Sequence, residues 1–151
     1  MVPNASLEDA CEERVSVWDF YGNYVILDNS QPDCGPCQSM AADAPEAIDA
    51  MHEEGLPVYA MTVLGASLSD ILSEPSDSDW KAWLSAFGAD DPILKDRGYG
   101  YALLADEDGS ISYPIYAIVA PDMTVITIDG GYSTGTWDEI ANIIRDHADG
   151  G

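Results

Sequence analysis

Residues 24–38 read YVILDNSQPDCGPCQ, an apolar run followed by a short turn and then by Cys34-Gly35-Pro36-Cys37. The continuous apolar run is typical of a central strand that is covered on both faces. The two cysteines, with two residues between them, come where this strand is followed by the N-terminus of a helix. This layout is that of a redox-active dithiol. We interpret the rest of the chain as the scaffold that holds the two sulfurs.

After the cysteines, apolar residues recur at steps of three and four, which predicts a helix with one face toward a sheet. The helix ends at Gly55-Leu56-Pro57, and Pro45 inside it is expected to kink it. Val58–Leu64 is the next buried strand. Strand, helix and strand in this order form a β-α-β unit with a right-handed crossover, which indicates an α/β fold. The apolar positions of the helix are Cys37, Met40, Ala41, Ala44, Ile48 and Met51.

The segments on either side of this unit have weaker patterns. Residues 1–13 are expected to form an extended lead-in, and the alternation in Arg14–Tyr21 (RVSVWDFY) suggests an edge strand. A further helix begins at the capping residues 76–78 and ends near Gly88, and Pro92–Asp96 is expected to form a short strand. The apolar face of that helix consists of Trp80, Trp83, Leu84 and Phe87, which we expect in the core.

The C-terminal third predicts a hairpin and a closing helix. Pro114 precedes an apolar strand that runs to Ala120, residues 121–123 make a tight turn, and Thr124–Ile128 returns antiparallel. Trp137–His147 has the spacing of an amphipathic helix. Because no repeat and no low-complexity linker interrupts the chain, we expect residues 1–151 to form a single domain.

The charge balance excludes some classes of partner. The chain has 5 Lys and Arg against 28 Asp and Glu, a formal net charge of −23. Nucleic acid and anionic membrane surfaces bind through basic patches, so we expect neither as a partner. The main interpretation of the acidity is a solvated coat that keeps the protein soluble, and the alternative is recognition of a basic partner.

Membrane insertion and a targeting segment are not indicated. The longest apolar runs, such as Pro57–Leu64 and Ile115–Pro121, are far shorter than the roughly 18 residues of a membrane span. The first residues, MVPNASLEDACEE, are polar and acidic, although an exported protein in its mature form would look the same. The third cysteine, Cys11, has no evident partner and is expected to be a small buried apolar residue.

The chain resembles the thioredoxin superfamily, and within it the TlpA-like branch of extracytoplasmic thiol-disulfide oxidoreductases. The resemblance rests on VILDNSQPDCGPC, on the β-α-β unit through Leu64, and on YPIYAIVAPDMTVITIDGG, and it spans roughly residues 14–148. It implies an α/β thioredoxin fold with a central mixed sheet of about four to five strands flanked by helices. It also implies a monomer without a cofactor that acts on disulfide-containing or dithiol proteins. An extracytoplasmic (periplasmic or secreted) location is favoured by this branch, and a cytoplasmic one stays open.

The resemblance also assigns roles to residues. Cys34 is the implied attacking nucleophile and Cys37 the resolving thiol, with Gly35 and Pro36 between them at the substrate-binding surface. Pro114 is the implied cis-proline, and Tyr113 before it offers backbone to an extended substrate. Asp28, six residues before Cys34, stands where thioredoxins have a buried acid that helps proton transfer at the second cysteine.

Two departures from the family pattern stand out. Asp33 replaces the tryptophan usually found before the first cysteine, and the helix proline comes late, at Pro45. The start of a helix lowers the pKa of a cysteine, whereas an adjacent carboxylate and the negative net charge raise it. We therefore expect the Cys34–Cys37 couple to be reducing.

Three other functions compete with thiol-disulfide exchange. A peroxidase of the same fold usually has Thr and Arg near its cysteine, whereas the surroundings here are acidic, and a copper chaperone would need a wider cysteine spacing and a nearby His. A third alternative is a binding module in which the cysteines form a structural disulfide. A metal site is not expected, because CGPC alone leaves half of a tetrahedral zinc site unfilled and neither His52 nor His147 lies at ligand spacing.

Overall fold

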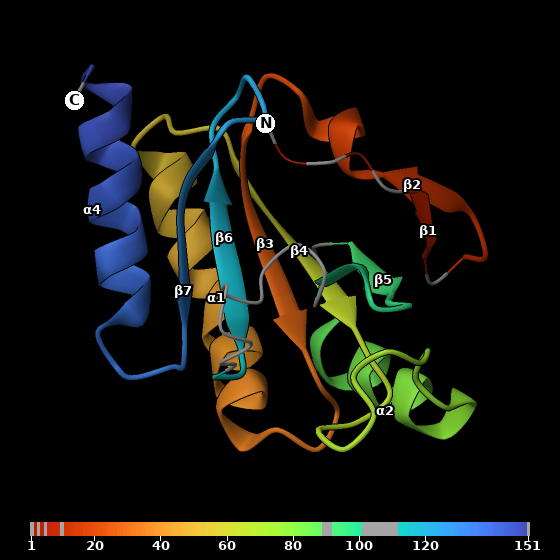
Figure 1. Cartoon of the computed structure of the whole chain (residues 1–151). Coiled ribbons are helices and arrows are strands. Elements are labelled where there is room, and N and C mark those ends of the chain that lie inside the picture. Colours follow the sequence, from red (N-terminus) through yellow and green to blue (C-terminus); the bar gives the residue numbers. More distant parts are fainter. Residues whose placement is uncertain are drawn as a thin grey trace.

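A five-stranded mixed sheet forms the centre of the computed structural model, which describes residues 2, 4, 6–9, 11–88, 92–100 and 112–150. The strand order is β5-β4-β3-β6-β7 (Figure 1). The central strand β3 pairs parallel with β4 and antiparallel with β6, and β5 and β7 form the two edges. The bounds are Tyr24–Ser30 for β3, Val58–Leu64 for β4, Ile93–Lys95 for β5, Ile115–Val119 for β6 and Val125–Gly130 for β7.

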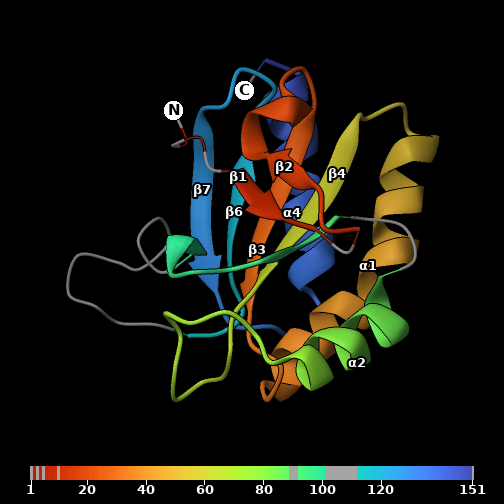
Figure 2. The same ribbon diagram turned by 90° about the vertical axis from the view of Figure 1, so that its right-hand side faces the viewer.

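Three helices lie on one side of this sheet. α1 (Gly35–Glu53) and α4 (Thr136–Ala148) pack on it side by side, and α2 (Asp77–Phe87) lies next to the N-terminal half of α1 (Figures 1 and 2). The core beneath α1 and α4 consists of alternate strand residues and the apolar helix faces, as a half-buried helix and a pleated strand require. Its members include Ile26, Met40, Met51, Ile118, Trp137, Ile140 and Ile144.

A small hairpin covers the opposite face of the sheet (Figure 2). β1 (Ser6–Glu8) and β2 (Arg14–Ser16) pair antiparallel in a sheet of their own, and the short 3-10 helix η1 (Val17–Phe20) follows. The strand predicted over Arg14–Tyr21 was therefore too long: only Arg14–Ser16 is a strand, and it pairs with β1 outside the five-stranded sheet. The carboxylate of Asp19 accepts a hydrogen bond from the backbone N–H of Ser16, and this capping contact ends the strand and starts the 3-10 turn.

Most of the other predicted elements are confirmed. Ser76 caps α2 by accepting a hydrogen bond from the N–H of Asp79, and α2 ends at Gly88. The strand predicted at Pro92–Asp96 is β5, and the predicted hairpin is β6 and β7. α1 continues through Pro45. The fold class predicted from the sequence, a mixed sheet of four to five strands flanked by helices, is confirmed.

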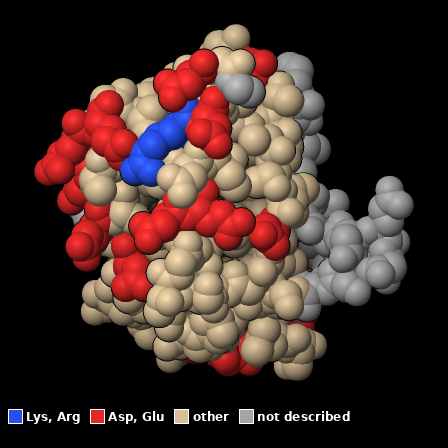
Figure 3. Space-filling model, turned by 90° about the vertical axis from the view of Figure 1, so that its left-hand side faces the viewer, with Lys and Arg blue, Asp and Glu red and all other residues tan. Residues whose placement is uncertain are grey.

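The surface is acidic. On the side of the molecule where α4 lies, Asp and Glu form patches over much of the surface and Lys and Arg occupy only a small area (Figure 3). Arg145 on α4 pairs with Glu54 through two hydrogen bonds, of 2.6 and 2.7 Å. Both side chains are exposed, so this pair contributes little to stability. Within the described part of the chain, no helix is both long enough and apolar enough to span a membrane.

Candidate active site

Cys34 and Cys37 form a disulfide at the start of α1, with their Cα atoms 5.2 Å apart. Cys34 is the N-cap residue of the helix, and its Sγ accepts a hydrogen bond of 3.2 Å from the backbone N–H of Cys37. The N-terminal end of a helix carries unpaired N–H groups and a positive partial charge, both of which favour a thiolate. Cys34 therefore has the position that activates an attacking cysteine.

The residues between the cysteines begin the helix. Gly35 and Pro36 occupy its first two positions and are exposed, and proline is favoured there because it has no N–H to lose. A Cβ atom at Gly35 would meet nothing within 4 Å. Gly35 is therefore not needed to make room within the described structure, and the space above it is open to another molecule.

The disulfide is largely covered. Cys34 is 3% exposed and Cys37 is fully buried, so Cys34 is the more accessible of the two by a small margin. Both cysteines belong to one apolar cluster with Leu64, Trp80, Trp83 and Ile93. Trp80 and Trp83 come from α2, so this helix covers one side of the sulfur pair.

Tyr113 and Pro114 approach the same cluster from another part of the chain. The peptide bond between them is cis, and the Tyr113 side chain packs against the cluster that contains the cysteines. The backbone here is fixed to the end of β7, because the N–H of Gly131 donates to the carbonyl oxygens of Ser112 and Pro114 at 3.0 and 2.9 Å. The fold thus brings the residues before β6 to the dithiol.

Asp28 is buried on β3, on the sheet face that α1 covers. It is 5% exposed, and its Oδ1 accepts a hydrogen bond of 2.9 Å from the hydroxyl of Ser30. Burial raises the pKa of Asp28 to about 7. The hydrogen bond from Ser30 lowers this pKa, but by a smaller amount. The carboxyl therefore exchanges its proton near neutral pH.

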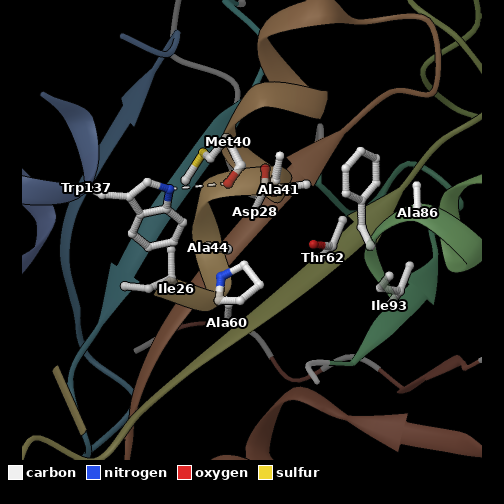
Figure 4. A pocket seen from close by; sticks show the side chains of 13 residues that line it. Ile26, Asp28, Met40, Ala41, Ala44, Ala60, Thr62, Ala86, Ile93 and Trp137 are labelled. Carbon is white, nitrogen blue, oxygen red and sulfur yellow. Dashed lines mark hydrogen bonds between the residues drawn. The ribbon is translucent and has the colours of Figure 1, made fainter. Parts of the chain in front are cut away.

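A cavity of about 230 Å³ connects Asp28 with the underside of α1 (Figure 4). Ala41, one turn after Cys37 on α1, lines this cavity and also packs in the cysteine cluster. Thr62, which pairs with Asp28 across β3 and β4, is its other polar neighbour in the strands. Small residues keep the cavity open, namely Ala41, Ala42, Ala44, Ala60 and Ala86. Asp28 and the helix segment that carries Cys37 thus share one space.

Asp33 is exposed beside Cys34, and its carboxylate has a partner. Its Oδ1 accepts a hydrogen bond of 2.8 Å from the backbone N–H of Leu68 in the loop after β4. Two apolar side chains of this loop, Leu68 and Leu72, are about half exposed, at 48% and 59%. Asp33 therefore holds an exposed apolar loop next to the disulfide.

Of the residues singled out from the sequence, Cys34, Cys37 and Tyr113 share one apolar cluster, with Gly35 and Pro36 between the cysteines and Pro114 next to Tyr113. Asp28 lines the cavity under α1 and is not part of that cluster. Trp80, Trp83, Thr62 and the loop at Leu68 were not assigned to the site from the sequence. The aromatic spacing of α2 was visible, but nothing in it said which part of the fold the helix covers. Cys11 is exposed rather than buried as predicted, in the turn between β1 and β2. The described residues contain no group of three or more His, Cys, Asp or Glu that could hold a metal ion.

Comparisons with known proteins agree with this geometry. No family model and no curated protein matches the sequence. Among solved structures, the chain is similar to the thioredoxin domain of a thiol-disulfide oxidoreductase from Bacteroides vulgatus, with 16% identity, a TM-score of 0.68, and coverage of 97% of this chain and 95% of that one.

Two further structures have a similar extent. The exposed lipoprotein thioredoxin Etrx1 of Streptococcus pneumoniae is 22% identical, with a TM-score of 0.66 and coverage of 95% and 99%. A secreted disulfide oxidoreductase of Mycobacterium tuberculosis, homologous to Escherichia coli DsbE, is 14% identical, with a TM-score of 0.66 and coverage of 94% and 95%. Two of these neighbours are described as disulfide oxidoreductases and one as a thioredoxin, and the likeness shows that the chain has the thioredoxin fold.

Proposed function

We propose that this protein is a thiol-disulfide oxidoreductase that reduces or exchanges disulfides in partner proteins through Cys34 and Cys37. The observation that carries the proposal is the disulfide at the N-terminus of α1, with Cys34 as the N-cap residue and a cis-proline segment packed against the same cluster. The solved structures similar to this chain include proteins described as thiol-disulfide oxidoreductases, which supports the same chemistry.

In the proposed reaction the reduced protein attacks a substrate disulfide. The Cys34 thiolate forms a new S–S bond with one substrate sulfur, and the other substrate sulfur leaves as a thiolate that takes a proton from solvent. Cys37 then loses its proton and attacks Cys34, which restores the Cys34–Cys37 disulfide and releases the second substrate thiol. The substrate gains two electrons and the protein loses two. A dithiol reductant restores the starting state, so no cofactor is needed.

Asp28 is the proposed proton acceptor for Cys37. A buried thiol needs a base when it becomes the nucleophile, and a carboxyl with a pKa of about 7 can take a proton at neutral pH and release it again. The cavity under α1 supports this role, because it joins Asp28 to the helix turn that follows Cys37.

The substrate is proposed to lie across Gly35, Pro36, Tyr113 and Pro114. Gly35 and Pro36 follow Cys34 directly and are exposed, Tyr113 packs against the cysteine cluster, and the open space above Gly35 leaves room for an extended chain. We propose an extracytoplasmic location, supported by structural neighbours that are described as secreted or as an exposed lipoprotein.

Insulin reduction with dithiothreitol tests the proposed function. Reduction of insulin's interchain disulfides makes its B chain precipitate, and a catalytic dithiol shortens the time before turbidity rises. We expect micromolar protein to accelerate precipitation clearly over dithiothreitol alone. A turbidity curve that matches dithiothreitol alone would instead favour a binding module whose disulfide is structural.

The reduction potential of the couple is expected to be low. Asp33 beside Cys34 and the net charge of −23 oppose a second negative charge, so they disfavour the thiolate and with it the reduced form. We expect a potential nearer to about −270 mV, the value of thioredoxin, than to about −120 mV, the value of DsbA. Equilibration with glutathione buffers measures it, and a potential above about −180 mV would contradict this expectation.

Asp33→Asn isolates the contribution of the carboxylate. Asparagine keeps an oxygen that can accept from the N–H of Leu68, so the loop contact is retained while the charge is lost. We expect the potential to rise by about 10 to 20 mV, the equivalent of less than 1 kcal/mol. Asp70→Asn is the matched control, because Asp70 lies in the same loop and no described residue hydrogen-bonds to its carboxylate.

A further inference from the structure

A groove of about 200 Å³ lies between the start of α1 and α2, and Trp83 in its lining also packs in the cluster that holds the disulfide. One wall is made by Pro32 and Gln38, which flank the two cysteines in the sequence, and the Gln38 side chain is fixed by a hydrogen bond to the Pro32 carbonyl at 2.9 Å. The other wall is made by α2. The groove therefore begins where a substrate would be joined to Cys34.

The inner surface of the groove is aromatic. Trp83 and Phe87 line it, with ring centroids 4.8 Å apart in an edge-on contact. Trp83 is 4% exposed and packs in the same cluster as both cysteines. Its indole Nε1 is buried and has no hydrogen-bond acceptor among the described residues. The ring thus offers the groove an apolar aromatic surface beside the cysteine cluster.

The rim of the groove carries a negative charge. Asp79 lines it from the first turn of α2 and is exposed, and no described residue hydrogen-bonds to its carboxylate. This sets it apart from Asp33, whose carboxylate already accepts from Leu68. An aromatic surface bordered by one carboxylate suits a long aliphatic chain that ends in a cation.

We propose that this groove binds a lysine side chain of the substrate protein close to the cysteine under attack. The lysine methylene groups lie against Trp83 and Phe87, and its ammonium group meets Asp79. The proposal rests on the proposed function, since it names the class of disulfide that the dithiol selects. The net charge of −23 adds a longer-range attraction for basic partners.

Three disulfide peptides that differ at the residues flanking cysteine, as lysine, norleucine or glutamate, test the proposal. Norleucine has the lysine stem without its charge. We expect kcat/KM for reduction to be about fivefold higher with lysine than with norleucine, and lowest with glutamate. In Asp79→Asn the preference for lysine over norleucine should fall about threefold, which lies within the range of an exposed ion pair.

Asp77→Asn is the matched control. Asp77 lies in the same first turn of α2, is also exposed and does not line the groove, so its replacement removes the same charge from the same helix terminus. We expect this variant to keep the lysine preference of the unchanged protein. An equal fall of the lysine preference in both variants would mean that the preference comes from the overall charge. That result would contradict the proposal that the groove binds lysine.

A binding measurement separates this proposal from the proposed function. The same peptides with serine in place of cysteine cannot react, and their binding is followed through the NMR signal of the Trp83 indole N–H, assigned with Trp83→Phe. A larger shift of this signal with the lysine peptide than with the norleucine peptide supports lysine binding in the groove, even if insulin is not reduced. No difference between the three peptides overturns it, even if insulin is reduced.

Discussion

Replacement of Cys34 by serine is expected to abolish insulin reduction. The serine hydroxyl is not ionised at neutral pH and cannot form a disulfide, so the first step of the exchange has no nucleophile. Cys37 is fully buried and cannot take over, since it is covered by the cluster that includes Trp80 and Trp83. We expect the rate above that of dithiothreitol alone to fall by more than about 100-fold.

Cys11→Ser is the control for this variant. Cys11 is exposed, lies in the turn between β1 and β2, and is not part of the disulfide. The variant should therefore keep the activity of the unchanged protein. If Cys34→Ser retained the activity and Cys11→Ser lost it, the reactive thiol would be Cys11 and the assignment of the site would be wrong.

Asp28→Asn is expected to change how stability depends on pH. Burial raises the pKa of Asp28 from 3.8 to about 7, so between these values the carboxyl is ionised in the unfolded chain and protonated in the folded one. The folded state then binds more protons, and the free energy of unfolding falls as pH rises from about 4 to 7. At about 1.4 kcal/mol for each pH unit, this loss is about 4 kcal/mol.

Asparagine cannot ionise, so this contribution disappears in the variant. We expect the decrease in the free energy of unfolding from pH 4 to pH 8 to be about 4 kcal/mol smaller in the oxidised Asp28→Asn variant than in the unchanged protein. Urea unfolding at a series of pH values measures both curves, and the comparison cancels all groups that the two proteins share. Parallel curves would mean that Asp28 ionises in the folded protein as it does in the unfolded chain.

The same variant should slow the second half of the reaction. Without the carboxyl, Cys37 loses its proton to water, and we expect release of the mixed disulfide at pH 7 to slow by about 100-fold. Attack by Cys34 should keep its rate, because Asp28 lines the cavity beneath α1, and Cys34 does not. Rapid-mixing measurements with a fluorescent disulfide peptide separate the two steps.

Asp96→Asn serves as the control for the kinetic effect. Asp96 is another buried carboxyl with a raised pKa, caused mainly by burial, but it is held by the Asn29 amide, which points to the opposite face of the sheet from Asp28. Its loss can alter stability without touching proton transfer at Cys37. A slow second step in Asp96→Asn but not in Asp28→Asn would exclude Asp28 as the proton acceptor.

The parts of the fold that could be predicted from the sequence are those where contacts are local. The apolar run of β3, the periodic face of α1 and the run of β4 each follow from neighbouring residues, and the structure has them at nearly the expected positions. β2 was predicted too long, because Asp19 caps the N–H of Ser16 three residues away and the alternating pattern does not show such a contact.

The rest of the site depends on contacts between distant segments. Thr62 faces Asp28 only because of the register of two parallel strands, which the helix between them sets. Likewise, α2 covers the cysteines because Trp80 and Trp83 pack against Leu64, and Asp33 reaches Leu68 across 35 residues of chain. No pattern within a single segment encodes such pairings. The groove and the cavity under α1 therefore could not be predicted from the sequence.

Trapping of a substrate on the Cys37→Ser variant tests most directly whether Cys34 is the attacking thiol. The variant is mixed in its reduced form with an oxidised disulfide peptide, and the product is digested without reductant and analysed by mass spectrometry. We predict a stable mixed disulfide on Cys34, and none when Cys34 is also replaced by serine. A peptide attached to Cys11, or no adduct at all, would contradict the account.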